Sequence, residues 1–173
     1  DEHDTMKSPV TDICDLTREL PPDAPDAPQW LVDALQVPRE EGWVNSDGCD
    51  VHFFRWGDPA NPPLLLMHGF LAHARCMAFI APFLAEQYHV IAYDLSGMGD
   101  SGVRSSYPDA VRAQEVVDVA RETGLFDHAI KPIVIAHSYG GHVGLAAMND
   151  FHELFGGLVV CDLMVVRPER LKA

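Results

Sequence analysis

The chain has 173 residues and a formal net charge of −14 when its histidines are neutral. Its 47% hydrophobic and 22% charged residues are typical of a soluble globular domain with one hydrophobic core. The negative charge argues against binding to nucleic acid or to anionic membrane surfaces, because both attract Lys and Arg.

Residues 1–28 are acidic and rich in proline, and they lack hydrophobic periodicity, so we expect an N-terminal arm there. A short helix is predicted at 29–37, because Pro38 cannot continue it. No apolar run is long enough to span a membrane, and the first residues carry no signal-peptide pattern. A cytoplasmic location is therefore the default expectation.

From residue 50 onward, apolar strand-like runs alternate with helical patterns. Strands are predicted at 50–56, 64–68, 88–94, 132–137 and 156–164, and helices at 74–87, 108–124 and 139–151. The clearest helical stripe consists of Ala113, Val116, Val117 and Ala120. Strand–helix alternation with continuous apolar strands predicts an α/β fold, in which a mostly parallel sheet carries helices on both faces. The predicted α/β domain spans residues 29–164.

A lone serine lies between the strand at 132–137 and the helix that follows. Ser138 has small neighbours two residues away on each side, Ala136 and Gly140, as a sharp strand-to-helix turn demands. Such a turn exposes the hydroxyl and aims the next backbone N–H, that of Tyr139, at developing negative charge. The pattern predicts a nucleophilic serine; the alternative is a serine that only caps the helix.

Two other strand ends carry glycine-containing motifs. In "LLLMHGF" the N–H of Phe70 is a candidate second oxyanion donor, although an ordinary turn with a structural His68 explains the same residues. In "YDLSGMGDSG" Asp94 is interpreted as a turn-organising residue. This glycine loop lacks the Lys-Ser/Thr of a phosphate-binding P-loop, and its glycines do not open a helix.

The four cysteines show no C-x-x-C spacing, which argues against a zinc or dithiol motif. Cys76 and Cys161 lie in apolar contexts and are expected to be reduced core residues.

The order of HGF, DLSGMGDS and AHSYGG, each after a buried strand, resembles the α/β-hydrolase fold family over residues 42–164. This resemblance implies that Ser138 is the nucleophile and that the N–H groups of Phe70 and Tyr139 form the oxyanion hole. It also implies a structural role for Asp94. Ala136 stands where the commonest family pattern has glycine. Members with a nucleophilic aspartate, such as epoxide hydrolases and haloalkane dehalogenases, are disfavoured because a serine occupies that position.

A serine nucleophile needs a base, usually a histidine oriented by a carboxylate. In this fold the chain order is serine, acid, histidine. Only His142 and His152 follow Ser138, and neither follows a late strand as the histidine of the family does. Asp162 follows the last predicted strand and is a candidate acid; otherwise it caps or anchors its loop.

The resemblance implies that the sequence stops after the sixth strand of the fold, with 165–173 as the beginning of a lid. We therefore expect a second chain, a C-terminal portion or a dimer to supply the acid and histidine. The leading hypothesis is a carboxylesterase-like serine hydrolase with a small, largely apolar substrate and no metal or organic cofactor. Carbon–carbon bond hydrolysis stays open. The rivals are a truncated, non-catalytic protein that binds a ligand or partner, and a nucleotide-binding module built on the glycine loop.

Overall fold

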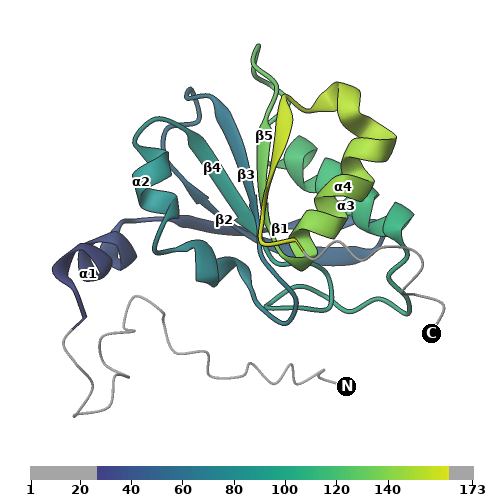
Figure 1. The fold of residues 1–173 in the computed structure, drawn as a ribbon, viewed down its shortest axis with the longest axis horizontal. Coiled ribbons are helices and arrows are strands. Elements are labelled where there is room, and N and C mark those ends of the chain that lie inside the picture. The colour runs from purple at the N-terminus through teal and green to yellow at the C-terminus, as the bar shows by residue number, and fades with distance from the viewer. Residues whose placement is uncertain (1–26, 164–173) are drawn as a thin grey trace, which may run out of the picture.

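A computed structural model describes residues 27–163 (Figure 1). All but the last two residues of the predicted arm at 1–28, and the whole of the predicted lid segment at 165–173, lie outside this range. The described residues form a single six-stranded sheet with the strand order β1-β2-β4-β3-β5-β6.

The strands are β1 (Glu40–Ser46), β2 (Cys49–Trp56), β3 (Pro63–Met67), β4 (His89–Tyr93), β5 (Ile133–His137) and β6 (Gly157–Cys161). The α-helices are α1 (Gln29–Gln36), α2 (Ala81–Ala85), α3 (Asp109–Glu122) and α4 (Tyr139–Phe151). Among residues 27–163 there are also two short 3₁₀ helices, η2 (Ala74–Met77) and η3 (His152–Leu154).

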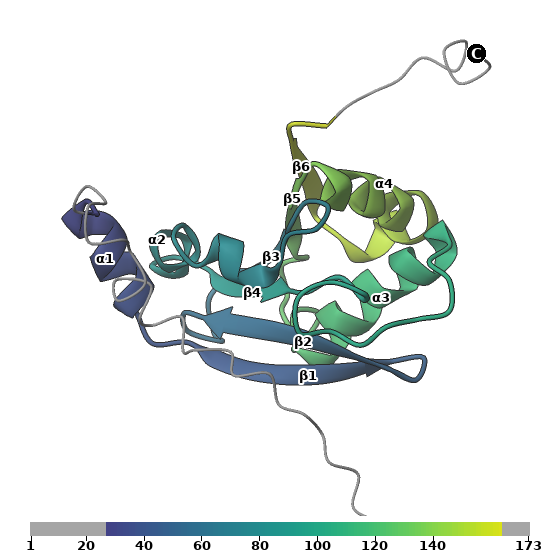
Figure 2. The same ribbon diagram turned by 90° about the horizontal axis from the view of Figure 1, so that it is seen from below.

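The sheet separates two layers of helices. α3 and α4 lie on one side of the sheet and α2 on the other, which both views show (Figures 1 and 2). Val116 and Ala120 of α3 are fully buried against the first face, as the helical stripe predicts. Leu64 and Leu66 of β3 are buried against the second face. Strands β4, β3, β5 and β6 run parallel, whereas β1 and β2 add an antiparallel hairpin. The predicted fold class is thus confirmed.

Two elements differ from the sequence prediction. The strand β1 was not expected, and it pairs with β2 through a two-residue turn in which Asp47 and Gly48 both have positive φ. The single helix predicted at 74–87 is instead η2 followed by α2. Pro82 explains this break, because it lacks an N–H and is tolerated only in the first turn of a helix, where it lies in α2.

The strand β6 forms one edge of the sheet among residues 27–163. Its Val159 is 49% exposed, and Ile133 of the neighbouring strand is 38% exposed, so this end of the sheet presents an apolar face in the described part of the chain. Within the same residues, no helix combines the length and apolar character needed to cross a membrane.

Candidate active site

Ser138 occupies the tight turn between β5 and α4 with φ +50° and ψ −116°. A side chain with a Cβ rarely adopts this conformation, so the backbone is strained. The turn is held from both sides: the N–H of Ser138 donates to the carbonyl of Cys161 at 2.9 Å, and its own carbonyl accepts from the N–H of Gly141 at 2.8 Å. The side chain is half-buried at the carboxyl ends of the parallel strands.

The start of α4 packs closely against the end of β3. A Cβ atom placed on Gly140 would lie 2.6 Å from the carbonyl oxygen of His68. Ala136, which precedes the serine by two residues, is fully buried. Small side chains at both positions are therefore what allows the turn to approach β3, as the sequence predicts.

The loop after β3 lies directly against the serine. A Cβ atom placed on Gly69 would be 3.3 Å from the Cβ of Ser138. The rings of Phe70 and Tyr139 meet edge to face with centroids 5.7 Å apart. The N–H of Tyr139, at the first position of α4, has no acceptor within its helix. In residues 27–163 the N–H of Phe70 has no backbone acceptor. The structure thus brings the serine and both predicted oxyanion residues together.

His68 is fixed between two loops. Its Nε2 accepts the N–H of Leu95 at 3.0 Å, so its Nδ1 carries the proton and donates to the carbonyl of Gly69 at 2.7 Å. Burial lowers the pKa of His68 below its usual value, because a charged imidazole would be poorly solvated there. The neutral ring of His68, hydrogen-bonded through both nitrogens, joins the loop that contains Gly69 to the loop after β4.

Asp94 organises the glycine loop after β4. Its buried carboxylate accepts the N–H groups of Ala74 and Asp100 and lies 2.8 Å from Nδ1 of His52. Burial acts to raise the pKa of Asp94, but the hydrogen bonds from His52 and the two amides outweigh it and hold the pKa below the usual value. This carboxylate joins β2, η2 and the glycine loop, which agrees with the turn-organising role predicted for it.

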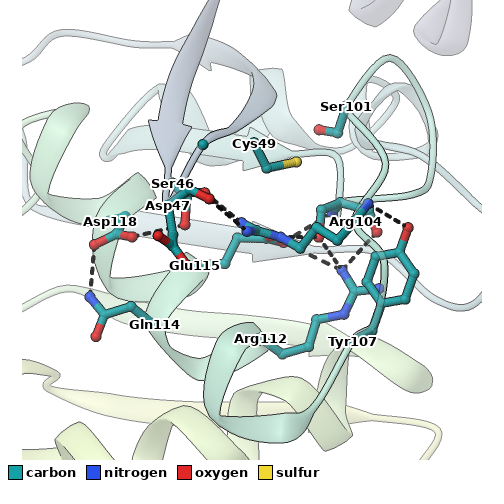
Figure 3. Close-up of polar contacts among 12 residues, drawn as sticks. Ser46, Asp47, Cys49, Ser101, Arg104, Tyr107, Arg112, Gln114, Glu115 and Asp118 are labelled. Carbon is teal, nitrogen blue, oxygen red and sulfur yellow. Dashed lines mark hydrogen bonds and ion pairs between the residues drawn. The ribbon is translucent and has the colours of Figure 1, made fainter.

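A second buried network holds the same loop from the side of α3 (Figure 3). Glu115 is fully buried and accepts the N–H of Ser96 at 3.0 Å. Arg104 and Arg112 reach the same carboxylate at 3.1 and 3.4 Å. The guanidinium of Arg112 also lies 5.9 Å from the ring centroid of Tyr139. The loop and the start of α4 are therefore fixed relative to one another.

The sequence did not indicate a cation-binding group, but three side chains offer close ligand atoms. Glu41, His52 and Asp100 place one ligand atom each within 4.8 Å of one another. These atoms already have partners, since Nε2 of His52 lies 2.9 Å from Glu41 and Arg75 lies 2.8 Å from Asp100. The burial of His52 acts to lower its pKa, but Asp94 and Glu41 hold the pKa above the usual value. The imidazole of His52 thus lies between the carboxylates of Asp94 and Glu41.

In residues 27–163 no histidine is hydrogen-bonded to the hydroxyl of Ser138. His142 is exposed on α4, and the side chain of His152 is 79% exposed beside Glu153. Asp162, the candidate acid, is exposed directly after β6 with φ +57°. Asp162 is adjacent to Cys161, whose carbonyl accepts the N–H of Ser138. Asp162 therefore lies at the same carboxyl end of the parallel strands as the serine.

An apolar cavity of about 480 Å³ opens beside the turn that carries Ser138. Its lining includes Gly69, Cys76, Ile80, Leu84, His137 and Cys161. Cys76 and Cys161 are free and exposed, so the prediction that they are core residues is wrong in that respect. Cys76 lies in η2 and Cys161 at the end of β6, and the side chains of both line the cavity. An apolar substrate was expected from the sequence, but the residues that line the cavity were not, because they come from separate elements that include β3, η2, α2, β5 and β6.

Comparison with known proteins gives a consistent picture. The model of the Alpha/beta hydrolase family matches residues 64–172. Uncharacterized hydrolase YugF of Bacillus subtilis is 28% identical over 116 residues, which are 66% of this chain and 41% of that protein. Soluble epoxide hydrolase of Corynebacterium sp. is 29% identical over 141 residues, 81% of this chain and 46% of that protein.

Among solved structures, the thioesterase domain from the curacin biosynthetic pathway superposes with a TM-score of 0.70 and 26% identity. The match covers 79% of this chain and 48% of that one. The chain thus spans less than half the length of the relatives named here.

Proposed function

The chain belongs to the α/β hydrolase family, and from this premise we propose that the protein is a serine hydrolase that cleaves an ester or related acyl bond. The observation that carries the proposal is the strained Ser138 at the β5–α4 turn, with the Gly69–Phe70 loop against it. A small, largely apolar substrate suits the cavity beside this turn, because its lining is predominantly hydrophobic.

In the proposed reaction the hydroxyl oxygen of Ser138 attacks the substrate carbonyl and forms a tetrahedral intermediate. The N–H groups of Phe70 and Tyr139 donate to its oxyanion; each such donor contributes about 3 kcal/mol to stabilisation of the transition state. Collapse releases the alcohol or thiol and leaves an acyl-serine, which water then hydrolyses.

The proton of the Ser138 hydroxyl needs an acceptor. We place the catalytic histidine outside residues 27–163, in a C-terminal portion or a second chain, because no described histidine contacts the hydroxyl. Asp162 is the candidate acid, since it follows β6 at the edge where the serine lies. Its carboxylate would orient the imidazole, as in other serine nucleophile sites.

Epoxide hydrolysis is a second candidate because Soluble epoxide hydrolase of Corynebacterium sp. is among the relatives. The chemistry of the nucleophile favours acyl transfer. A carboxylate that opens an epoxide forms an ester, which water can hydrolyse, whereas a serine oxygen would form an ether that resists hydrolysis. Ser138 therefore favours an acyl substrate over an epoxide.

Hydrolysis of p-nitrophenyl acetate, butyrate and octanoate, and of styrene oxide, tests the proposal, with the full-length protein assayed together with the C-terminal portion or second chain that carries the histidine. We expect ester hydrolysis that Ser138→Ala lowers by at least about a thousandfold. Ser106→Ala, which changes an exposed serine, should leave the rate unchanged. Epoxide opening that survives Ser138→Ala would contradict the proposal. Folded protein with no turnover of any substrate would favour the non-catalytic, ligand-binding alternative.

A further inference from the structure

The cavity beside Ser138 contains nucleophiles that the proposed hydrolysis does not use. Of the three free cysteines in the described residues, Cys76 and Cys161 are exposed and line this cavity, whereas Cys49 is buried elsewhere. The remaining lining is almost entirely hydrophobic. A hydrophobic cavity concentrates apolar molecules near these thiols by excluding water from both surfaces.

Cys76 has a base beside it. Its Sγ lies 3.7 Å from Nδ1 and 3.9 Å from Nε2 of His73, within the range of a sulfur hydrogen bond. An imidazole in contact with a thiol can accept its proton and leave the nucleophilic thiolate. No such partner contacts Cys161 in residues 27–163.

The backbone holds this pair in place. The N–H of Cys76 donates to the carbonyl of His73 at 3.0 Å. Ala74, which follows His73, is buried and donates its N–H to the carboxylate of Asp94. The thiol and the imidazole are therefore positioned at the start of η2 by the same carboxylate that organises the glycine loop.

We propose that Cys76 is a covalent binding site for apolar α,β-unsaturated carbonyl compounds, and that the adduct fills the cavity beside Ser138. His73 takes the thiol proton, and the sulfur bonds to the β-carbon of the electrophile. The electron pair of the carbon–carbon double bond moves toward the carbonyl as the enolate, and the α-carbon then takes the proton back from His73. The addition is complete without an oxidant or a leaving group.

The expected loss of Ser138 reactivity rests on the proposed function, whereas the formation of the Cys76 adduct does not. Because Gly69 and His137 line the cavity and adjoin Ser138, an adduct there blocks the approach of an acyl substrate. Cys49 is an internal control, because burial raises the pKa of its thiol and shields it from solvent.

The experiment treats the full chain with N-cyclohexylmaleimide, an apolar unsaturated imide, and follows each cysteine by peptide mass spectrometry. We expect Cys76 to react at least about tenfold faster than Cys49, with a rate that saturates with reagent concentration. The unreactive N-cyclohexylsuccinimide should slow this reaction by competing for the cavity. His73→Gln should lower the rate at Cys76 about tenfold or more. His152→Gln, a change at an exposed histidine, should not alter it.

Circular dichroism confirms that each variant is folded before the rates are compared. A rate at Cys76 that rises linearly with reagent and equals that at Cys49, or one that is unchanged in His73→Gln, would overturn the proposal. Labelling of Ser138 by a fluorophosphonate should fall as the Cys76 adduct accumulates, but not in Cys76→Ser. If Ser138 takes no label even without maleimide, the proposed hydrolase function fails, while the alkylation rates still decide the Cys76 site.

Discussion

Ser138 combines a position at the carboxyl ends of the parallel strands with an unfavourable backbone conformation. Its φ of +50° is imposed by the hydrogen bond to Cys161 on one side and by the start of α4 on the other. The cost of such a conformation falls on residues that have a Cβ atom and disappears for glycine. Strain of this kind is expected where a hydroxyl must be exposed on a sharp turn.

This strain gives a prediction for stability. Ser138→Gly should raise the free energy of unfolding by roughly 1 kcal/mol, because glycine adopts the positive φ without a steric penalty. Urea unfolding followed by circular dichroism measures the change. The matched variant Ser138→Ala keeps the Cβ atom and should change stability by only a few tenths of a kcal/mol. Equal stabilities of the two variants would contradict the strained turn.

At this scale the sequence was informative where a site comes from contiguous motifs. Ser138, Phe70 and Tyr139 were predicted as a set, because each lies within three residues of a strand end, and the structure brings them together. The cysteines were misjudged for the opposite reason. An apolar neighbourhood in sequence does not reveal which face of a strand or helix stays open, so the exposure of Cys76 and Cys161 required the packed structure.

Among the elements, α3 fixes the loop that carries the glycine motif. Glu115 is buried between two arginines and also holds the N–H of Ser96. One carboxylate therefore compensates the buried positive charge of Arg104 and Arg112. Its removal leaves charges in a low-dielectric site without a partner, which is more costly than the pair is stabilising.

Glu115→Gln should therefore lower the free energy of unfolding by roughly 3 kcal/mol. Thermal and urea unfolding monitored by circular dichroism give this difference. Glu122→Gln, near the end of the same helix on its exposed side, is the control and should change stability by less than about 0.5 kcal/mol. A loss in Glu115→Gln no larger than in the control would show that the buried network does not hold the loop.

How well the ends of helices and strands were predicted depended on the strength of the local sequence signal at each end. The helix α4 was predicted at its observed bounds, because a strand-ending turn and a continuous apolar run mark both its ends. The hairpin strand β1 was missed, although the Asp47-Gly48 pair is a strong turn signal. Its buried face carries only one large apolar side chain, Val44, while Trp43 lies on the exposed face, so the apolar–polar alternation of a strand is weak. The interruption between η2 and α2 followed from Pro82, whose position in the first turn of a helix implies a new start.

At the scale of the whole molecule, the pH dependence of stability reflects a buried histidine at the start of β4. His89 is 2% exposed, and both of its ring nitrogens lack hydrogen-bond partners in the described residues. Burial first, and then the charges of Arg55 and His128, lower its pKa to about 4. The unfolded chain binds a proton at this histidine near pH 6.5, whereas the folded chain does so only near pH 4.

Stability should therefore fall as the pH drops from about 6.5 to 4, because the unfolded state binds more protons in this window. His89→Leu removes this contribution, so its stability relative to the natural chain should rise by up to roughly 3 kcal/mol between pH 7 and pH 4. Urea unfolding at a series of pH values measures the difference. His152→Gln, at an exposed histidine, should show no such trend, and a pH-independent difference for His89→Leu would contradict the assignment.

The central claim is that the fold activates Ser138 as a nucleophile. Its most direct test is the intact mass of the full protein before and after reaction with a fluorophosphonate, with the modified residue mapped by peptide mass spectrometry. We predict one adduct per chain, located on Ser138, that is absent from Ser138→Ala and from urea-unfolded protein. Folded protein that takes no label, or label on another residue that persists in Ser138→Ala, would contradict the claim.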